Sequence, residues 1–178
     1  MSADVVNSDR LDSVDGLRES GFEGFRSVSH LRQSTCLEVP VARGVYVVVR
    51  DTDAPPEFLA RSVGGWYRHV DPSVAVDQLE EKWVDGALVL YIGQAPGPGV
   101  RSLLQQRVKR DIRFGQGKAI AHSGGPTLWQ LRDHLALQFA WRPTPDDDPA
   151  LTEAELIGAF RARYGRLPFA NLRDEKPE

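Results

Sequence analysis

The stretch Gly44-Val45-Tyr46-Val47-Val48-Val49-Arg50 constrains the fold most strongly. Its β-branched and aromatic residues run together after Pro40, which predicts a well-buried strand, and the turn-forming residues 51–56 end it. The stretch Ala87-Leu88-Val89-Leu90-Tyr91-Ile92-Gly93 predicts a second strand, and Leu137-Gln138-Phe139-Ala140-Trp141 alternates like a third. Because only a loop-like insertion separates the first two strands, we expect them to pair antiparallel.

Two longer helices are predicted after the second strand. The first starts with Ser102 as its N-cap and ends near Phe114-Gly115, where glycine would supply a left-handed cap. The other begins at a capping box from Thr152 to Glu155 and ends at Gly165. Together with the strands they give a small α/β arrangement. Weaker patterns predict a short helix at Phe58-Leu59, helical spacing over Val76, Leu79 and Trp83, a short helix over Leu128, Leu131 and Leu135, and a short helix and extended piece within 22–38.

At 178 residues, with 41% hydrophobic and 26% charged side chains, the chain has the composition of an ordinary globular domain. We expect residues 1–20, which are acidic and carry few large apolar groups, to form a flexible tail, and 21–178 to form one domain. No apolar run approaches the roughly 18 residues that span a bilayer, and the N-terminus lacks the features of a signal peptide. The single cysteine, Cys36, excludes an intrachain disulfide. A cytoplasmic location without a membrane partner is therefore expected.

Five short motifs occur in a fixed order along the chain. The motifs are Gly44-Val45-Tyr46, Tyr91-Ile92-Gly93, Leu104-x-x-Arg107, Glu153 three residues before Leu156-Ile157, and Pro168-x-x-Asn171. In that order, over about residues 40–175, the chain resembles the GIY-YIG nuclease superfamily.

The resemblance implies a small three-stranded antiparallel sheet flanked by helices and a metal-dependent endonuclease that cleaves phosphodiester bonds by water attack. By motif, Glu153 would bind one Mg²⁺ or Mn²⁺, and Arg107 would hold the phosphate, whose oxygens its planar guanidinium fits. Tyr46 would position or deprotonate the attacking water. Tyr91 would hydrogen-bond at the phosphate, and Asn171 would hold the geometry of the site.

The chain departs from the family pattern at two positions beside these motifs. Many members have Lys after the second tripeptide, where this chain has Gln94, and His or Tyr four residues after the arginine, where it has Asp111. The identity of the general base is therefore open, and Lys118 or His122 in the glycine-rich loop could take that role.

Two further points stay open at this stage. Glu155, the capping-box residue, is the rival of Glu153 for the metal. The 44 residues between Tyr46 and Tyr91 are also far more than the family usually has there. We expect the insertion 51–86 to fold over the sheet or its edge, where it could bind a protein partner or set substrate specificity.

The charge distribution restricts where a nucleic acid could bind. The formal net charge of −3 and a pI of about 5.8 argue against a long, non-specific electrostatic footprint. Residues 95–140 nevertheless hold seven Lys or Arg residues against two Asp residues, a net charge of +5. We expect this segment to contact nucleic acid, with DNA favoured over RNA, through Lys109, Arg110, Arg113, Lys118 and His122. The alternative is a catalytically weak or inactive relative that serves as a nucleic-acid or protein binding module.

Overall fold

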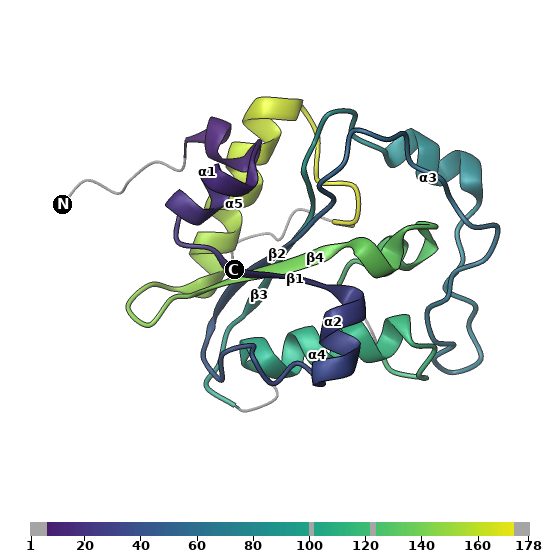
Figure 1. Cartoon of the computed structure of the whole chain (residues 1–178), viewed down its shortest axis with the longest axis horizontal. Helices are drawn as coiled ribbons and strands as arrows, with labels where there is room; N and C mark the ends of the chain where they lie inside the picture. Colours follow the sequence, from purple (N-terminus) through teal and green to yellow (C-terminus); the bar gives the residue numbers. More distant parts are fainter. Residues whose placement is uncertain (1–6, 100–101, 122–123, 173–178) are drawn as a thin grey trace.

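The computed structural model describes residues 7–99, 102–121 and 124–172 (Figure 1). Four strands of the described chain form one sheet: β1 (Glu23–Ser27), β2 (Gly44–Val49), β3 (Val89–Ala95) and β4 (Gln138–Pro143). The α-helices are α1 (Val14–Glu19), α2 (Val28–Ser34), α3 (Val76–Lys82), α4 (Leu104–Gly115) and α5 (Pro149–Tyr164). Short 3₁₀ helices cover η1 (Ser8–Leu11), η3 (Pro126–Gln130) and η4 (His134–Ala136).

The strands pair in the order β1-β4-β2-β3, and every pairing is antiparallel. The predicted α/β class and the antiparallel pairing of the first two predicted strands are confirmed. The expected number of three strands is wrong, because β1 adds a fourth strand beside β4. That strand is difficult to predict: Phe25 lies at φ 50° and the β1–β4 register shifts between Gly24 and Arg26, so no regular alternation marks it.

The two faces of the sheet are covered by different helices, as Figure 1 shows. Val45, Val47 and Val49 pack under α1 and α5, whereas Tyr46 and Val48 pack under α2 and α4. Every residue of β2 is buried because this strand lies between two others and is covered on both sides. The prediction of a well-buried strand from 44 is therefore confirmed.

The described part of the expected N-terminal tail belongs to the folded body. Leu11 and Leu17, from η1 and α1, are buried against the core on the α5 side of the sheet. Asp12 accepts hydrogen bonds from Arg163 and Tyr164, which attach this stretch to the end of α5. A flexible tail is thus wrong for residues 8–20, while residues 1–6 lie outside the described residues.

Tertiary contacts set the helix ends where local sequence predicted otherwise. Helix α4 begins at Leu104 rather than after a Ser102 cap, because the carbonyl oxygens of Ala42 and Pro40 accept from the amides of Leu104 and Gln105. Its last residue is Gly115, where a Cβ would overlap the ring of Trp129, and the left-handed residue that follows is Gly117, at φ 86°.

The last helix and two shorter elements also differ in part from expectation. Asp148, not a Thr152 capping box, caps α5 by accepting from the amide of Ala150, whereas the end at Gly165 is confirmed. Phe58 forms an isolated bridge with Leu131 instead of a short helix. The short helix over 128–135 is present as the two 3₁₀ segments η3 and η4.

The insertion between β2 and β3 is attached to the domain through Arg50, which is only 8% exposed. Its Nε donates to Oδ2 of Asp133 at 2.7 Å, and its Nη1 donates to the carbonyl oxygen of Ala54 at 2.7 Å. The guanidinium also lies over the ring of Trp83, 5.7 Å from its centroid. Arg50 therefore connects both ends of the insertion to the segment that precedes β4.

No helix in the described part of the chain is long and apolar enough to cross a membrane.

Candidate functional site

The two predicted tyrosines meet on the α4 face of the sheet. Tyr46 on β2 and Tyr91 on β3 have ring centroids 5.9 Å apart. Gly93 is the register partner of Tyr46, and a Cβ at this position would lie 2.7 Å from Cε1 of Tyr91 and 2.8 Å from Cζ of Tyr46. Only glycine fits between the rings, so the third residue of the second tripeptide is a packing requirement of the pair.

A buried hydrogen bond connects this pair to α4. The hydroxyl of Tyr46 donates to Oδ2 of Asp111 at 2.8 Å, and the two residues are 3% and 6% exposed. Asp111 lies four residues after Arg107, so one turn of helix places both on the same side of α4. Asp111, a departure from the family pattern, is therefore a direct partner of Tyr46.

Burial raises the pKa values of Asp111, Tyr46 and Tyr91. Burial raises the pKa of Asp111 to about 7, although the Tyr46 hydrogen bond and the charges of Arg107 and Arg110 lower it. Burial and the neighbouring charge of Asp111 raise the pKa of Tyr46 well above its ordinary value, and the pKa of Tyr91 in the same direction. The phenols are therefore protonated at neutral pH, and Asp111 is the group of this cluster that titrates there.

Arg107 lies half-buried beside the same cluster. Its Nε donates to the carbonyl oxygen of Gln94 at 3.1 Å, which fixes the guanidinium next to β3. Its positive charge lowers the pKa of Tyr46, Tyr91 and Asp111, so it lies within electrostatic reach of each. This placement puts a planar cation beside the tyrosine pair.

Asn171 holds the outer edge of β3. Its Oδ1 accepts from the amide of Ile92 at 3.0 Å, and its Nδ2 donates to the carbonyl oxygen of Ile92 at 2.9 Å. The amide of Ala170 also donates to Leu90 at 2.8 Å, so this segment continues the edge as a short strand would. Ile92 lies between Tyr91 and Gly93, and Asn171 therefore fixes the backbone that carries the site.

Glu153 and Glu155 differ in their surroundings, although both lie in the first half of α5. Glu153 is 4% exposed, and its negative charge helps to raise the pKa of Tyr91 from the α5 side of the sheet. Glu155 is exposed, and its charge, with that of Asp147, partly opposes the lowering of the Arg142 pKa by burial. Of the two, Glu153 is the one whose charge acts on Tyr91, but it lies on α5, which covers the opposite face of the sheet from the tyrosine pair.

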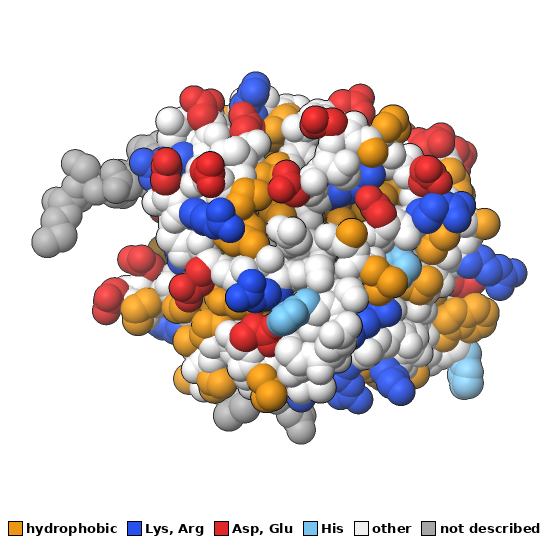
Figure 2. Space-filling model, in the orientation of Figure 1, with side chains coloured by type: hydrophobic (Ala, Val, Ile, Leu, Met, Phe, Trp, Pro, Cys, Tyr) orange, Lys and Arg blue, Asp and Glu red, His pale blue; other side chains and the backbone are white. Residues whose placement is uncertain are grey.

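The described basic residues of α4 lie on more than one side of the helix. At 3.6 residues per turn, Arg110 lies on the Asp111 side of α4, whereas Lys109 and Arg113 lie on the opposite side. Lys118 is exposed after the end of α4, and His122 lies outside the described residues. Figure 2 shows acidic side chains mostly on the upper half of this view and Lys and Arg side chains along its lower right edge.

Neither a side-chain cluster for a metal nor a reactive thiol marks this site. The described residues contain no group of three or more His, Cys, Asp or Glu side chains that could hold a metal ion. Any metal would therefore depend on Glu153 and on oxygens of the substrate. Cys36 is buried, and burial together with the charge of Glu38 raises the pKa of its thiol to about 12, so it is protonated and unreactive at neutral pH.

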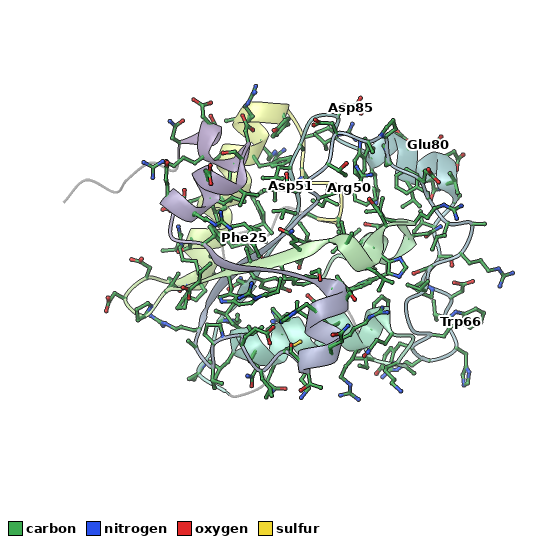
Figure 3. All side chains as sticks on the ribbon, in the orientation of Figure 1. Phe25, Arg50, Asp51, Trp66, Glu80 and Asp85 are labelled. Carbon is green, nitrogen blue, oxygen red and sulfur yellow. The ribbon has the colours of Figure 1, made fainter. Side chains whose placement is uncertain are left out.

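A separate hollow of about 460 Å³ lies beside α1, away from the tyrosine pair. Asp12, Asp15, Arg18, Phe25 and Asp51 contribute to its lining, and Figure 3 labels the last two. None of the predicted site residues lines it. The hollow is thus distinct from the candidate site.

Comparisons with the models of known protein families, with curated proteins and with solved structures gave no match. The site is therefore interpreted from its own geometry.

Proposed function

We propose that this protein is a metal-dependent endonuclease of the GIY-YIG type that cleaves phosphodiester bonds, with DNA favoured as substrate. The observation that supports this most directly is the joining of Tyr46, Tyr91 and Arg107 around one buried carboxylate, Asp111. Three of the five motif residues lie in this cluster, and Asn171 holds the strand beneath it. A cytoplasmic location is part of the same proposal.

Arg107 would supply the positive charge that a phosphodiester needs. The transition state of phosphoryl transfer carries negative charge on its non-bridging oxygens, and a guanidinium beside them stabilises it. The protonated hydroxyl of Tyr91, next to Arg107, would donate a hydrogen bond to the same oxygens. Donation of this hydrogen bond requires the Tyr91 phenol to be neutral, in agreement with its raised pKa.

Asp111 would be the final proton acceptor in the step. In this proposal the attacking water would contact the phenolic oxygen of Tyr46, whose hydroxyl is hydrogen-bonded to Oδ2 of Asp111. As the water oxygen bonds to phosphorus, the water gives a proton to the phenolic oxygen of Tyr46, and Tyr46 gives its own proton to Oδ2 of Asp111. The bond from phosphorus to the leaving oxygen breaks, and that oxygen takes a proton from solvent. A carboxylate of pKa about 7 is suited to this exchange near neutral pH.

Glu153 would be the protein ligand of Mg²⁺ or Mn²⁺. A single buried carboxylate fits a cation that binds through one or two carboxylates, water and substrate phosphate, and it does not fit a cation held by protein alone. The cation would stabilise the negative charge that develops on the phosphate.

The alternative is a nucleic-acid or protein binding module without turnover. The small exposure of Tyr46 and Asp111 favours it, since a structural pair in a core would have the same burial. A module that binds nucleic acid would bind in a salt-sensitive manner and would release its ligand uncleaved.

Cleavage assays with Mg²⁺ or Mn²⁺ on single-stranded, duplex and branched DNA and on RNA test the proposal. We expect wild-type cleavage and a loss of at least about a hundredfold in Glu153→Gln and Arg107→Ala. Glu155→Gln, from the same helix but exposed, is the matched control and should cleave as wild type does. If wild type cleaves no substrate with either metal, the nuclease proposal is wrong. If Glu153→Gln cleaves normally, the metal assignment is wrong.

A further inference from the structure

The insertion presents an exposed aromatic tip at the end of α4. Trp66, Tyr67 and Val70 are 50%, 40% and 65% exposed, although most large apolar side chains of the described chain are buried. Figure 3 shows Trp66 on the outer margin of the insertion, pointing away from the sheet. We call residues 66–70 the aromatic tip.

The tip is a tight hairpin with an unusual backbone. Tyr67 and Val70 form an isolated antiparallel bridge, and the amide of Val70 donates to the carbonyl oxygen of Tyr67 at 3.1 Å. The two residues between them, Arg68 and His69, have φ values of 51° and 62°. Non-glycine residues rarely adopt this left-handed conformation. The turn thus projects a cation and an imidazole between two apolar side chains.

The base of the tip is fixed on the C-terminal end of α4. The amide of Gly65 donates to the carbonyl oxygen of Phe114 at 3.0 Å. A Cβ at Gly65 would overlap the backbone of Lys118, and one at Gly64 would lie 2.5 Å from the ring of Phe114. Side chains other than glycine are therefore excluded at both positions, and Gly65, which directly precedes Trp66, lies against the backbone of Lys118.

The charges around the tip favour an anionic partner. Arg61, Arg68 and His69 belong to the same segment, and Asp71 is the only acidic residue of 61–73. Arg68 lies over the ring of Tyr67 at 5.2 Å. Hydrogen bonds from Ser73, with a smaller contribution from the charge of Arg61, lower the pKa of Asp71. Of the other acidic residues of the insertion, Asp51, Asp53 and Glu57 lie near its start and Asp85 near its end. Asp77, Glu80 and Glu81 lie on α3, and Figure 3 shows Glu80 on the opposite side of the insertion from Trp66.

We propose that the aromatic tip and Lys118 bind a single-stranded segment of nucleic acid, with Trp66 and Tyr67 stacked on unpaired bases. Aromatic planes bind bases by stacking, and a neighbouring cation binds the phosphate. Bases inside a duplex present no face to such side chains, so the substrate class is single-stranded or branched nucleic acid. This inference rests on the proposed function, since it supplies the substrate recognition for that same site.

Fluorescence anisotropy in EDTA, where no metal supports cleavage, tests the inference by itself. The probes are a labelled oligothymidylate single strand and a duplex of the same length. We expect Trp66→Ala and Tyr67→Ala each to weaken single-strand binding about tenfold and to change duplex binding less than twofold. Arg68→Ala and Lys118→Ala should each reduce the slope of log K against log salt by about 0.7. Leu151→Ala, which removes an exposed side chain from α5, is the control and should bind as wild type.

Three outcomes would overturn the inference. The double variant Trp66→Ala/Tyr67→Ala could bind the single strand as tightly as wild type, or lose duplex and single-strand binding equally. Sedimentation could instead show that wild type is a dimer and the double variant a monomer, which would make the tip an interface between copies of this chain. Cleavage assays separate these failures from failure of the proposed function. If wild type cleaves and the double variant still binds the single strand normally, the inference is wrong and the nuclease proposal stands. Tip-dependent binding without any cleavage retains the inference and rejects the nuclease.

Discussion

The hydroxyl of Tyr46 and Oδ2 of Asp111 form a 2.8 Å hydrogen bond between the second strand of the sheet and the helix that covers it. Ionisation of a carboxylate buried at this position is unfavourable in free energy, and a core of the same shape could hold an apolar side chain instead. In the proposed function this carboxylate accepts a proton, and its titration gives two separate measurements.

The first prediction concerns stability. The pKa of Asp111 is about 7 in the folded protein against an ordinary 3.8, so the folded state binds more protons than the unfolded state between these values. The free energy of unfolding contributed by Asp111 therefore falls as pH rises from about 4 to about 7. We expect Asp111→Asn to be more stable than wild type at pH 8, by about 2 kcal/mol, and to lose this advantage by pH 5. Urea denaturation of both proteins at the two pH values measures it; a difference that stays constant with pH would contradict the assignment.

The second prediction concerns the rate of cleavage. Because Asp111 must be ionised to accept a proton, the wild-type rate should rise through about pH 7 and then level off. Asp111→Asn keeps an oxygen for the Tyr46 hydroxyl but accepts no proton, so its rate should be lower by two to four orders of magnitude, about 10²–10⁴-fold, without the rise near pH 7. Single-turnover assays across this pH range give the profile. A variant that is slow but keeps the wild-type profile would mean that Asp111 has only a structural role.

The third prediction uses the close approach of Gly93 to both tyrosine rings. In Gly93→Ala the new methyl group would force the rings apart, since its Cβ would lie 2.7–2.8 Å from ring carbons. We expect a loss of about 1–3 kcal/mol in the free energy of unfolding and a loss of cleavage. Gly158→Ala is the matched control, because no atom lies within 4 Å of its Cβ in α5 and alanine favours a helix by about 1 kcal/mol. Thermal and urea denaturation distinguish the two; equal stability of both variants would contradict the packing described.

The fourth prediction concerns the attachment of the insertion. Arg50→Met leaves Asp133 without its ion pair and removes the donor to Ala54, so we expect a loss of about 2–3 kcal/mol, below the full value for a buried pair because Asp133 is 35% exposed. Arg132→Met breaks an ion pair with Glu57 in which both side chains are mostly exposed, and should change stability by less than about 0.5 kcal/mol. Should both variants lose the same stability, Arg50 would not be the residue that attaches the insertion.

The sequence predicted elements whose signal is local and missed those that depend on distant contacts. Residues 44–49 form a strand because alternate side chains face two apolar layers, and this pattern is visible in the residues themselves. The start of α4 depends on carbonyl groups of Pro40 and Ala42, more than sixty positions away from the first amides they bind, and no local pattern indicates it.

The candidate site shows the same division. The motifs identified Tyr46, Tyr91 and Arg107, which the fold brings together, but the sequence marked Asp111 only as a departure. Its pairing with Tyr46 joins residues 65 positions apart, so it depends on how α4 packs on β2. The signal that could have indicated this pairing was the position of Asp111 four residues after Arg107, on the same side of the helix.

The side-chain amide of Asn171 also has a consequence for self-association. The outer strand of an open sheet offers unpaired backbone groups to a second chain, which is a common origin of aggregates. Here the side chain of Asn171 already hydrogen-bonds the backbone amide and carbonyl of Ile92, and the amide of Ala170 donates to the carbonyl oxygen of Leu90. The segment after α5 thus covers the edge strand β3. A protein shortened before Pro168 would expose this apolar strand to other copies of the chain.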